Sequence, residues 1–144
     1  MQIDETDKKL LHLLAENARR SVSDLGRDLN LARTTVQARI ERLENFGHIA
    51  GYTVKLGKSL NANLRATALV CIEPRSTPAV LQRLKTLSQV ERVHTTSGRF
   101  DLIVEISAKT TEELDDTLDR IGEARGVKSS ESLIHLSTKI DRAI

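Results

Sequence analysis

Seven residues between positions 33 and 42 have side chains of the types that contact DNA: Arg33, Thr34, Thr35, Gln37, Ala38, Arg39 and Arg42. Arginine pairs with guanine and glutamine with adenine, whereas threonine and alanine touch the methyl group of thymine. We expect the first five to lie near base edges and Arg42 to contact phosphate, which positions a protein without specifying sequence. For Arg39, an ion pair with Asp28 or Glu44 of the same chain is an equally open prediction.

The spacing of apolar residues puts these side chains on the outer side of a helix. Leu25 and Leu29 are four residues apart and share one face of a preceding, shorter helix. The inward side of the longer helix has apolar residues at positions i, i+4 and i+7, namely Val36, Ile40 and Leu43. Two such helices joined by a tight turn predict a helix-turn-helix over residues 21–47, and the second helix of this motif enters the major groove of DNA.

Local signals mark the ends of these two helices. Ser21, three residues before Asp24, resembles a capping box with Asp in place of Glu. Asn30 lies where the turn needs a residue that tolerates a positive φ, and Gly47 suits a left-handed cap after the second helix. Ala32, which precedes the second helix, has no side-chain oxygen that could cap it.

In the rest of the N-terminal part, the sequence predicts one more helix and a strand. Asp4 suits the cap of a first helix over residues 4–17. Apolar residues then alternate with period two over residues 49–56, which predicts a β-strand. Residues 57–64 are rich in turn formers and are typical of a linker. We therefore expect a DNA-binding domain at residues 1–60 and a second domain at residues 61–144.

The second part has strand and helix signals in the order βαββαβ. Residues 66–72 are almost continuously apolar, which is typical of a strand buried on both faces. Pro78 opens a helix, and Thr110 with Glu113 predicts a capping box for another. The other predicted strands cover residues 90–97, 101–107 and 127–136. This order is the split βαβ, or ferredoxin-like, arrangement, so the predicted fold class is α+β: a tri-helical helix-turn-helix head and a ferredoxin-like tail.

Composition excludes several classes of protein. No apolar run approaches the roughly 18 residues that span a bilayer, and the acidic start of the chain is no signal peptide, so we expect a cytoplasmic protein without membrane contact. The single cysteine, Cys71, excludes an internal disulfide, and the histidines lack metal-ligand spacing, so we expect no metal and no cofactor. The net charge is only +2, so DNA binding must depend on a focused patch and on several copies acting together.

Motifs that are typical of one protein family lie along nearly the whole chain. In the head they are Ile3-Asp4-x-x-Asp7 with Leu10-Leu11, Ala18-Arg19, and Val36-x-x-Arg39-Ile40-x-Arg42-Leu43-Glu44-x-x-Gly47-x-Ile49-x-Gly51-Tyr52. In the tail they are Ser97-Gly98-Arg99-Phe100-Asp101 and Gly126-Val127. With these residues the chain resembles the leucine-responsive regulatory protein/asparagine regulator (Lrp/AsnC) family of transcription factors. The resemblance implies a winged-type DNA-binding head and an ACT-like, effector-binding tail, the RAM domain.

The resemblance also implies an assembly and a ligand. Members form dimers that associate into higher oligomers such as tetramers or octamers, and many bind an effector, usually an amino acid, near the turn between the second and third tail strands. We expect Asp101 to hold the ammonium group, and the turn amides with Ser130 or Ser132 to hold the carboxylate. Arg99, where the family often has an acidic or amide residue, adds a cation. The implied effector-binding residues are Gly98, Arg99, Phe100, Asp101, Ser130 and Ser132.

These observations predict a sequence-specific transcriptional regulator. It would bind double-stranded DNA as a homo-oligomer, and a small effector, an amino acid, would change its assembly or its affinity for DNA. The alternative is an architectural protein that wraps DNA with little sequence preference. An enzyme is not expected, because the sequence offers no convergent set of acid, base and nucleophile.

Overall fold

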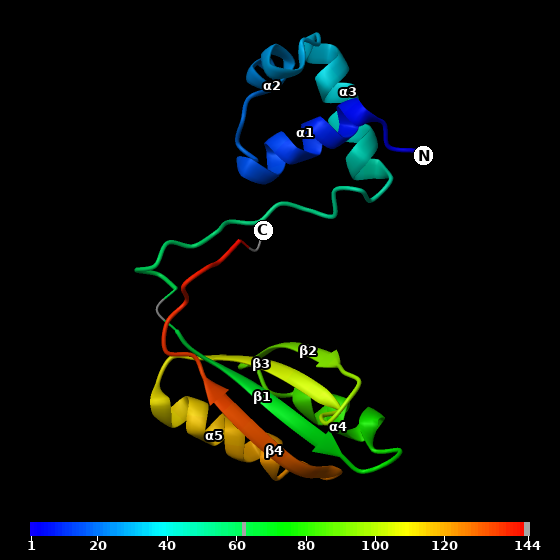
Figure 1. Ribbon diagram of the computed structural model, residues 1–144. Helices are drawn as coiled ribbons and strands as arrows, with labels where there is room; N and C mark the ends of the chain where they lie inside the picture. The colour runs from blue at the N-terminus through cyan, green and yellow to red at the C-terminus, as the bar shows by residue number, and fades with distance from the viewer. Residues whose placement is uncertain (62, 143–144) are drawn as a thin grey trace. The chain divides into compact units, whose positions relative to one another are not determined.

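The computed structural model describes residues 1–61 and 63–142, which fall into two compact units (Figure 1). Met1–Lys55 make up most of the first unit, and Leu56–Asp141 make up the second. The first unit contains the helices α1 (Glu5–Glu16), α2 (Val22–Leu29) and α3 (Arg33–Asn45). The predicted tri-helical head is therefore confirmed.

Five side chains from the three helices form the core of the first unit: Leu10, Leu14, Leu25, Val36 and Leu43. The helix α1 begins where the sequence predicts, because the Asp4 carboxylate accepts a hydrogen bond from the Asp7 amide at 2.7 Å and the Asp7 carboxylate accepts one from the Asp4 amide at 3.2 Å. This reciprocal capping satisfies two amides that an uncapped helix would leave without partners.

The turn between α2 and α3 has the predicted conformation. Asn30 adopts the left-handed conformation, with φ 55°. At the start of α2, the Ser21 hydroxyl accepts a hydrogen bond from the Asp24 amide at 3.0 Å, but the Asp24 carboxylate pairs with Arg27 instead of completing the predicted capping box. Gly26 is needed for a different reason, since a Cβ atom there would lie 2.7 Å from the carbonyl oxygen of Leu31. As predicted, Ala32 gives α3 no side-chain cap.

The predicted strand over residues 49–56 is wrong for this chain, which is irregular there. Ile49 packs against the core of the first unit, but the other apolar side chains of the segment are more than half exposed: Tyr52 at 55%, Val54 at 79% and Leu56 at 53%. A strand needs a neighbour to accept and donate its backbone hydrogen bonds. Among the described residues none pairs with this segment, because every strand pairing lies within the second unit.

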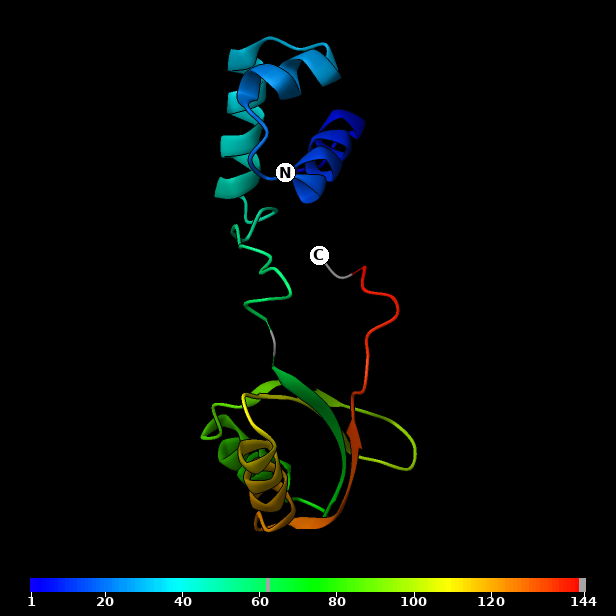
Figure 2. The same cartoon turned by 90° about the vertical axis from the view of Figure 1, so that its left-hand side faces the viewer.

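The second unit has the predicted βαββαβ order. Its elements are β1 (Leu64–Ile72), α4 (Thr77–Lys85), β2 (Val90–Thr95), β3 (Leu102–Ala108), α5 (Thr111–Gly122) and β4 (Val127–Ile134). The strands form one antiparallel sheet in the order β2-β3-β1-β4. Figure 2 shows α4 and α5 on the same face of this sheet, while the connection between β2 and β3 projects on the other side.

Because both helices cover the same face, β1 is buried on one side only. Ala66, Ala68 and Val70 point into the core and are at most 1% exposed, whereas the alternate residues are only half-buried. The prediction that this strand is buried on both faces is therefore wrong for the single chain. Cys71 lies on the uncovered side, where its thiol donates to the carbonyl oxygen of Arg99 at 3.3 Å.

The start of α5 differs slightly from the predicted capping box. The Thr110 hydroxyl accepts a hydrogen bond from the Glu113 amide at 3.1 Å, as expected. The Glu113 carboxylate, however, accepts bonds from the Lys109 amide and from the Gln89 side chain, each at 2.8 Å, rather than from Thr110. The bond from Gln89, followed by that from Lys109, lowers the pKa of Glu113.

Candidate nucleic-acid interface and ligand site

The outer face of α3 carries a shallow hollow of about 430 Å³. Its lining comes from five of the seven predicted DNA-contacting residues, namely Thr34, Thr35, Ala38, Arg39 and Arg42. The other two, Arg33 and Gln37, are exposed on the same helix. The Gln37 amide group donates to the Glu41 carboxylate at 3.2 Å, a contact between two exposed side chains that a base edge can replace. The structure therefore keeps polar groups available along the first turns of α3.

Arg39 differs from its neighbours because carboxylates of the same chain already bind one nitrogen, Nη1, of its guanidinium. Its Nη1 lies 2.8 Å from Oδ1 of Asp7 and 3.0 and 2.8 Å from the two carboxylate oxygens of Asp4. The hydrogen bond from Arg39 is the largest cause that lowers the pKa of Asp4 to about 2, and the same bonds raise the pKa of Arg39. The geometry makes Arg39 a residue that joins α3 to the start of α1.

Asp7 is the centre of this cluster. Its side chain is fully buried, and its second carboxylate oxygen lies 3.6 Å from Nη2 of Arg42. Arg42 is still 46% exposed, so one side of its guanidinium faces the Asp7 carboxylate and the rest is open to solvent. The sequence predicted Asp4 as a helix cap, but no local signal links Asp4 or Asp7 to arginines more than thirty positions away.

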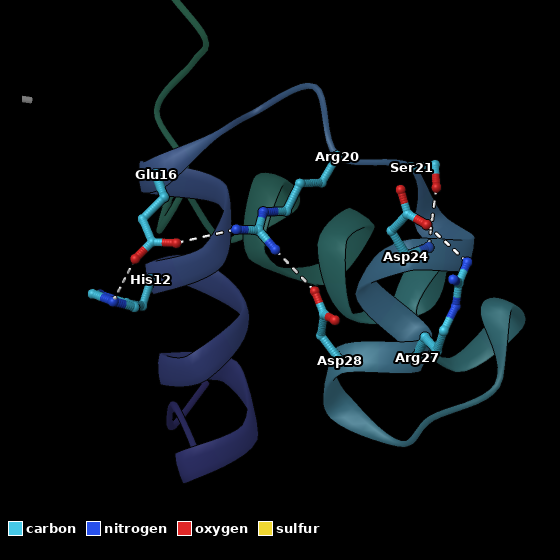
Figure 3. Close-up of polar contacts among 7 residues, drawn as sticks. All are labelled: His12, Glu16, Arg20, Ser21, Asp24, Arg27 and Asp28. Atoms are coloured by element: carbon cyan, nitrogen blue, oxygen red, sulfur yellow. Dashed lines mark hydrogen bonds and ion pairs between the residues drawn. The ribbon is translucent and has the colours of Figure 1, made fainter.

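The intramolecular partners that the sequence suggested for Arg39 are wrong. Asp28 pairs instead with Arg20, whose guanidinium also reaches Glu16 (Figure 3). The two distances are 2.9 Å to Asp28 and 3.1 Å to Glu16, so Arg20 connects the end of α1 to the end of α2. On the other side of α2, Arg27 pairs with Asp24 at 2.9 Å. The two Arg20 contacts hold α2 beside α1, whereas the Arg27–Asp24 pair lies within α2. The turn that follows α2 then positions α3.

The turn between β2 and β3 contains four of the six predicted effector-binding residues. Asp101 holds it to β1, since its carboxylate accepts from the Ile72 amide at 2.8 Å and its amide donates to the Val70 carbonyl at 2.9 Å. Gly98 has a φ of +110°, which only glycine adopts without strain. Within residues 63–142, the amides of Gly98, Arg99 and Phe100 donate no hydrogen bond, so they are available to an anion.

Arg99 extends from this turn over the uncovered side of the sheet. Its guanidinium carbon lies 5.1 Å from the centre of the Phe100 ring, and its Nη2 lies 3.6 Å from a carboxylate oxygen of Glu131 on β4. Both charged side chains remain mostly exposed, Arg99 at 81% and Glu131 at 54%. Glu131 was not among the predicted site residues, because strand periodicity gives no signal for a contact with the turn.

The predicted serines lie on the other face of β4. Ser130 and Ser132 are paired in register with Val70 and Ala68, whose side chains point into the core. A Cβ atom at Gly122 would lie 3.4 Å from the Ser130 hydroxyl, which places that hydroxyl beside α5. No hydrogen bond of the described residues joins either serine to the β2–β3 turn.

Each helix within residues 1–61 and 63–142 is too short or too polar to span a bilayer. The same residues contain no group of three or more His, Cys, Asp or Glu side chains arranged to hold a metal ion.

Each of the two units matches the model of a known protein family. The model of the AsnC-type helix-turn-helix domain matches residues 3–44, and the model of the Lrp/AsnC ligand binding domain matches residues 65–144. The chain belongs to the Lrp/AsnC family. A relative of this Lrp/AsnC chain, the HTH-type transcriptional regulator LysM of Sulfurisphaera tokodaii, is 30% identical over 135 residues, which are 93% of this chain and 95% of LysM.

Solved structures agree with the fold of this Lrp/AsnC chain. Escherichia coli AsnC matches with a TM-score of 0.89 at 23% identity, over 100% of this chain and 99% of AsnC. The feast or famine regulatory protein of M. tuberculosis, complexed with L-methionine, matches with a TM-score of 0.84 at 26% identity, over 98% and 97% of the two chains. This chain is therefore a transcriptional regulator of the Lrp/AsnC family, with a DNA-binding helix-turn-helix and a ligand-binding domain.

Proposed function

We propose that this regulator recognises a specific DNA sequence through the first turns of α3. The observation that carries the proposal is the hollow outer face of α3, where exposed donor groups surround a surface of small side chains. In this proposal the residues that read base edges are Arg33, Thr34, Thr35, Gln37 and Ala38. Arg42 binds phosphate, and Arg39 acts mainly by holding α3 against α1, because its hydrogen bonds already go to Asp4 and Asp7.

The ligand of the second unit is, in this proposal, an amino acid. The support is the match of residues 65–144 to the ligand binding domain and the L-methionine complex of a structural neighbour. The site is the β2–β3 turn, Gly98 to Asp101, where three amides have no acceptor within the described chain. Asp101 holds the turn in place through the hydrogen bond that its Oδ2 accepts from Ile72, and its second carboxylate oxygen stays open to the ammonium group.

The regulator acts, in this proposal, as a homodimer or a larger homo-oligomer. The support is the uncovered face of the sheet and the extended segment around Val54, both of which leave apolar side chains in solvent in a single chain. A net charge of +2 also favours several heads on one DNA molecule, since multivalency compensates for weak single contacts. A dimer would bind half-sites about 34 Å apart or a multiple of that distance.

The test is selection of binding sites from a pool of random DNA, followed by titration of the selected site with variants. We expect a defined sequence to emerge, and Arg33→Ala and Gln37→Ala each to weaken binding by about 1–3 kcal/mol while relaxing preference at one base pair. Arg83→Ala, which removes an exposed arginine of α4, is the matched control.

Two results would contradict the proposal. If no sequence is enriched and affinity depends only on salt, the protein is an architectural, DNA-wrapping protein instead. If a sequence is enriched but both α3 variants bind it as tightly as the original chain, another surface reads the DNA.

A further inference from the structure

Arg99 and Glu131 form an ion pair whose charged atoms lie farther apart than in a charged hydrogen bond. Their closest distance, 3.6 Å, is longer than a hydrogen bond between charged groups, which is typically about 2.7–2.9 Å. Both side chains are mostly exposed, and exposed pairs of this kind contribute little to stability. Each group therefore keeps most of its capacity to bind another partner of opposite charge.

The other polar groups near the turn are partly engaged in hydrogen bonds of the fold or face away. The Asp101 carboxylate accepts from the Ile72 amide at 2.8 Å, and this bond is part of what holds the turn on β1. Ser130 lies beside α5, on the face of β4 opposite to the Glu131 contact. Asp101 therefore offers a ligand its second carboxylate oxygen, whereas Glu131, which accepts no hydrogen bond from the described residues, can offer both of its oxygens.

We propose that Arg99 and Glu131 together recognise the charged groups of an amino acid that has an uncharged side chain. This inference rests on the proposed amino-acid ligand of the second unit. On binding, the α-carboxylate takes the place of Glu131 beside Arg99 and the turn amides, and the α-ammonium takes the place of Arg99 beside Glu131. In the absence of ligand the two residues neutralise each other.

The balance of charge argues for the uncharged side chain. When the ligand binds, Arg99 and Glu131 separate. A zwitterionic amino acid then gives each of them a new partner, the α-carboxylate for Arg99 and the α-ammonium for Glu131. An acidic or basic amino acid would bring one further charge, for which Arg99 and Glu131 offer no partner. When Arg99 moves, it also uncovers the half-buried Phe100 ring, which can pack against an apolar side chain.

The experiment uses the full chain and begins with its melting temperature in the presence of each of the twenty amino acids. We expect amino acids with uncharged side chains to raise the melting temperature most, because a ligand that binds only the folded state stabilises it. Calorimetric titration then compares the strongest of them with its hydroxy-acid analogue, which lacks the ammonium group, and with its amide, which lacks the carboxylate.

The variants Glu131→Gln and Arg99→Gln separate the two contacts. Each removes one charge, and we expect each to weaken amino-acid binding about tenfold to a hundredfold, since hydrogen bonds to charged groups are worth that much. Glu131→Gln should also lose the preference for the amino acid over its hydroxy acid. Arg99→Gln should lose the preference over the amide, and Arg99→Lys should retain part of it. Arg120→Gln, which breaks the exposed pair with Asp116 on α5, is the matched control.

The possible failures are distinguishable. If no amino acid stabilises the original chain, the proposed amino-acid ligand fails and this inference fails with it. If amino acids bind but both preferences persist unchanged in the Gln variants, the inference is overturned while the amino-acid ligand stands. A strongest ligand with a charged side chain would likewise overturn it.

Discussion

Each unit of the chain contains an arginine beside a carboxylate, but the two arrangements differ in how firmly they are held. In the first unit, Arg39 lies 2.8–3.0 Å from three carboxylate oxygens, one of which belongs to the buried Asp7. In the second unit, Arg99 lies 3.6 Å from the exposed Glu131. Water can replace Glu131 beside Arg99, whereas it cannot reach Asp7.

The residue types are the same in the two arrangements, so the difference between Arg39 and Arg99 lies in the distance and the burial of their carboxylate partners. A buried carboxylate without a partner is costly, so Asp7 keeps Arg39 in place and the pair joins α1 to α3. Glu131 is exposed and has no such need, so Arg99 stays available to a ligand. The same two residue types therefore serve as a structural connection in one unit and as a proposed recognition pair in the other.

The largest expected effect is on stability, from Asp7→Ala. This change leaves Arg39 without its buried partner and removes the reciprocal cap of α1, so we expect the first unit to lose about 3 kcal/mol of stability, the lower end for a broken buried pair. Urea unfolding followed by helical circular dichroism measures it. Lys8→Ala, which breaks only an exposed pair with Glu5, should cost less than about 1 kcal/mol. If Asp7→Ala and Lys8→Ala lost equal amounts of stability, the buried pair would contribute no more than an exposed one.

The next effect concerns DNA binding and separates Arg42 from Arg39. If Arg42 contacts one phosphate, Arg42→Ala should reduce the slope of log affinity against log salt concentration by about 0.9. Arg39→Ala should leave that slope unchanged, because Asp4 and Asp7 already balance its charge. Fluorescence anisotropy at four or five salt concentrations gives both slopes. A reduced slope for Arg39→Ala would instead show that Arg39 reaches phosphate.

Much of this fold follows from local signals that the sequence contains. Asp4, Ser21 and Thr110 each cap the helix that they were predicted to cap, because capping involves residues only three positions apart. The turn at Asn30 follows for the same reason. The order βαββαβ follows from the change of apolar period along the chain.

The errors arise where distant residues decide the outcome. The alternation at Tyr52 and Val54 predicts a strand, but a strand also needs a neighbour, and the periodicity of one segment does not provide it. The partners of Arg39 lie 32 and 35 positions away, so no spacing rule could select them over Asp28 or Glu44. Glu131 was missed for the same reason, since its contact with Arg99 depends on how β4 lies beside the turn.

A smaller effect is the pH dependence that Asp4 gives to the first unit. The pKa of Asp4 is lowered from 3.8 to about 2 in the folded chain, so the folded state binds this proton less readily than the unfolded state. The resulting stabilisation is complete above about pH 4 and is lost as the pH falls from 4 towards 2. The variant Asp4→Asn has no carboxylate at this position and lacks this stabilisation. The unfolding free energies of the variant and of the original chain should therefore differ at pH 7 and converge near pH 2. Thermal unfolding across that range tests this, and a constant difference would contradict it.

The smallest expected effect is that of Arg99→Gln on the unliganded chain. An exposed pair at 3.6 Å contributes about 0–1 kcal/mol, so the unfolding free energy should change by no more than that, as for the control Arg120→Gln. Arg39→Gln should cost more, because it leaves the buried Asp7 without its closest partner. If Arg99→Gln proves as costly as Arg39→Gln, Arg99 is a structural residue, and a ligand could not separate it from Glu131 without unfolding part of the sheet.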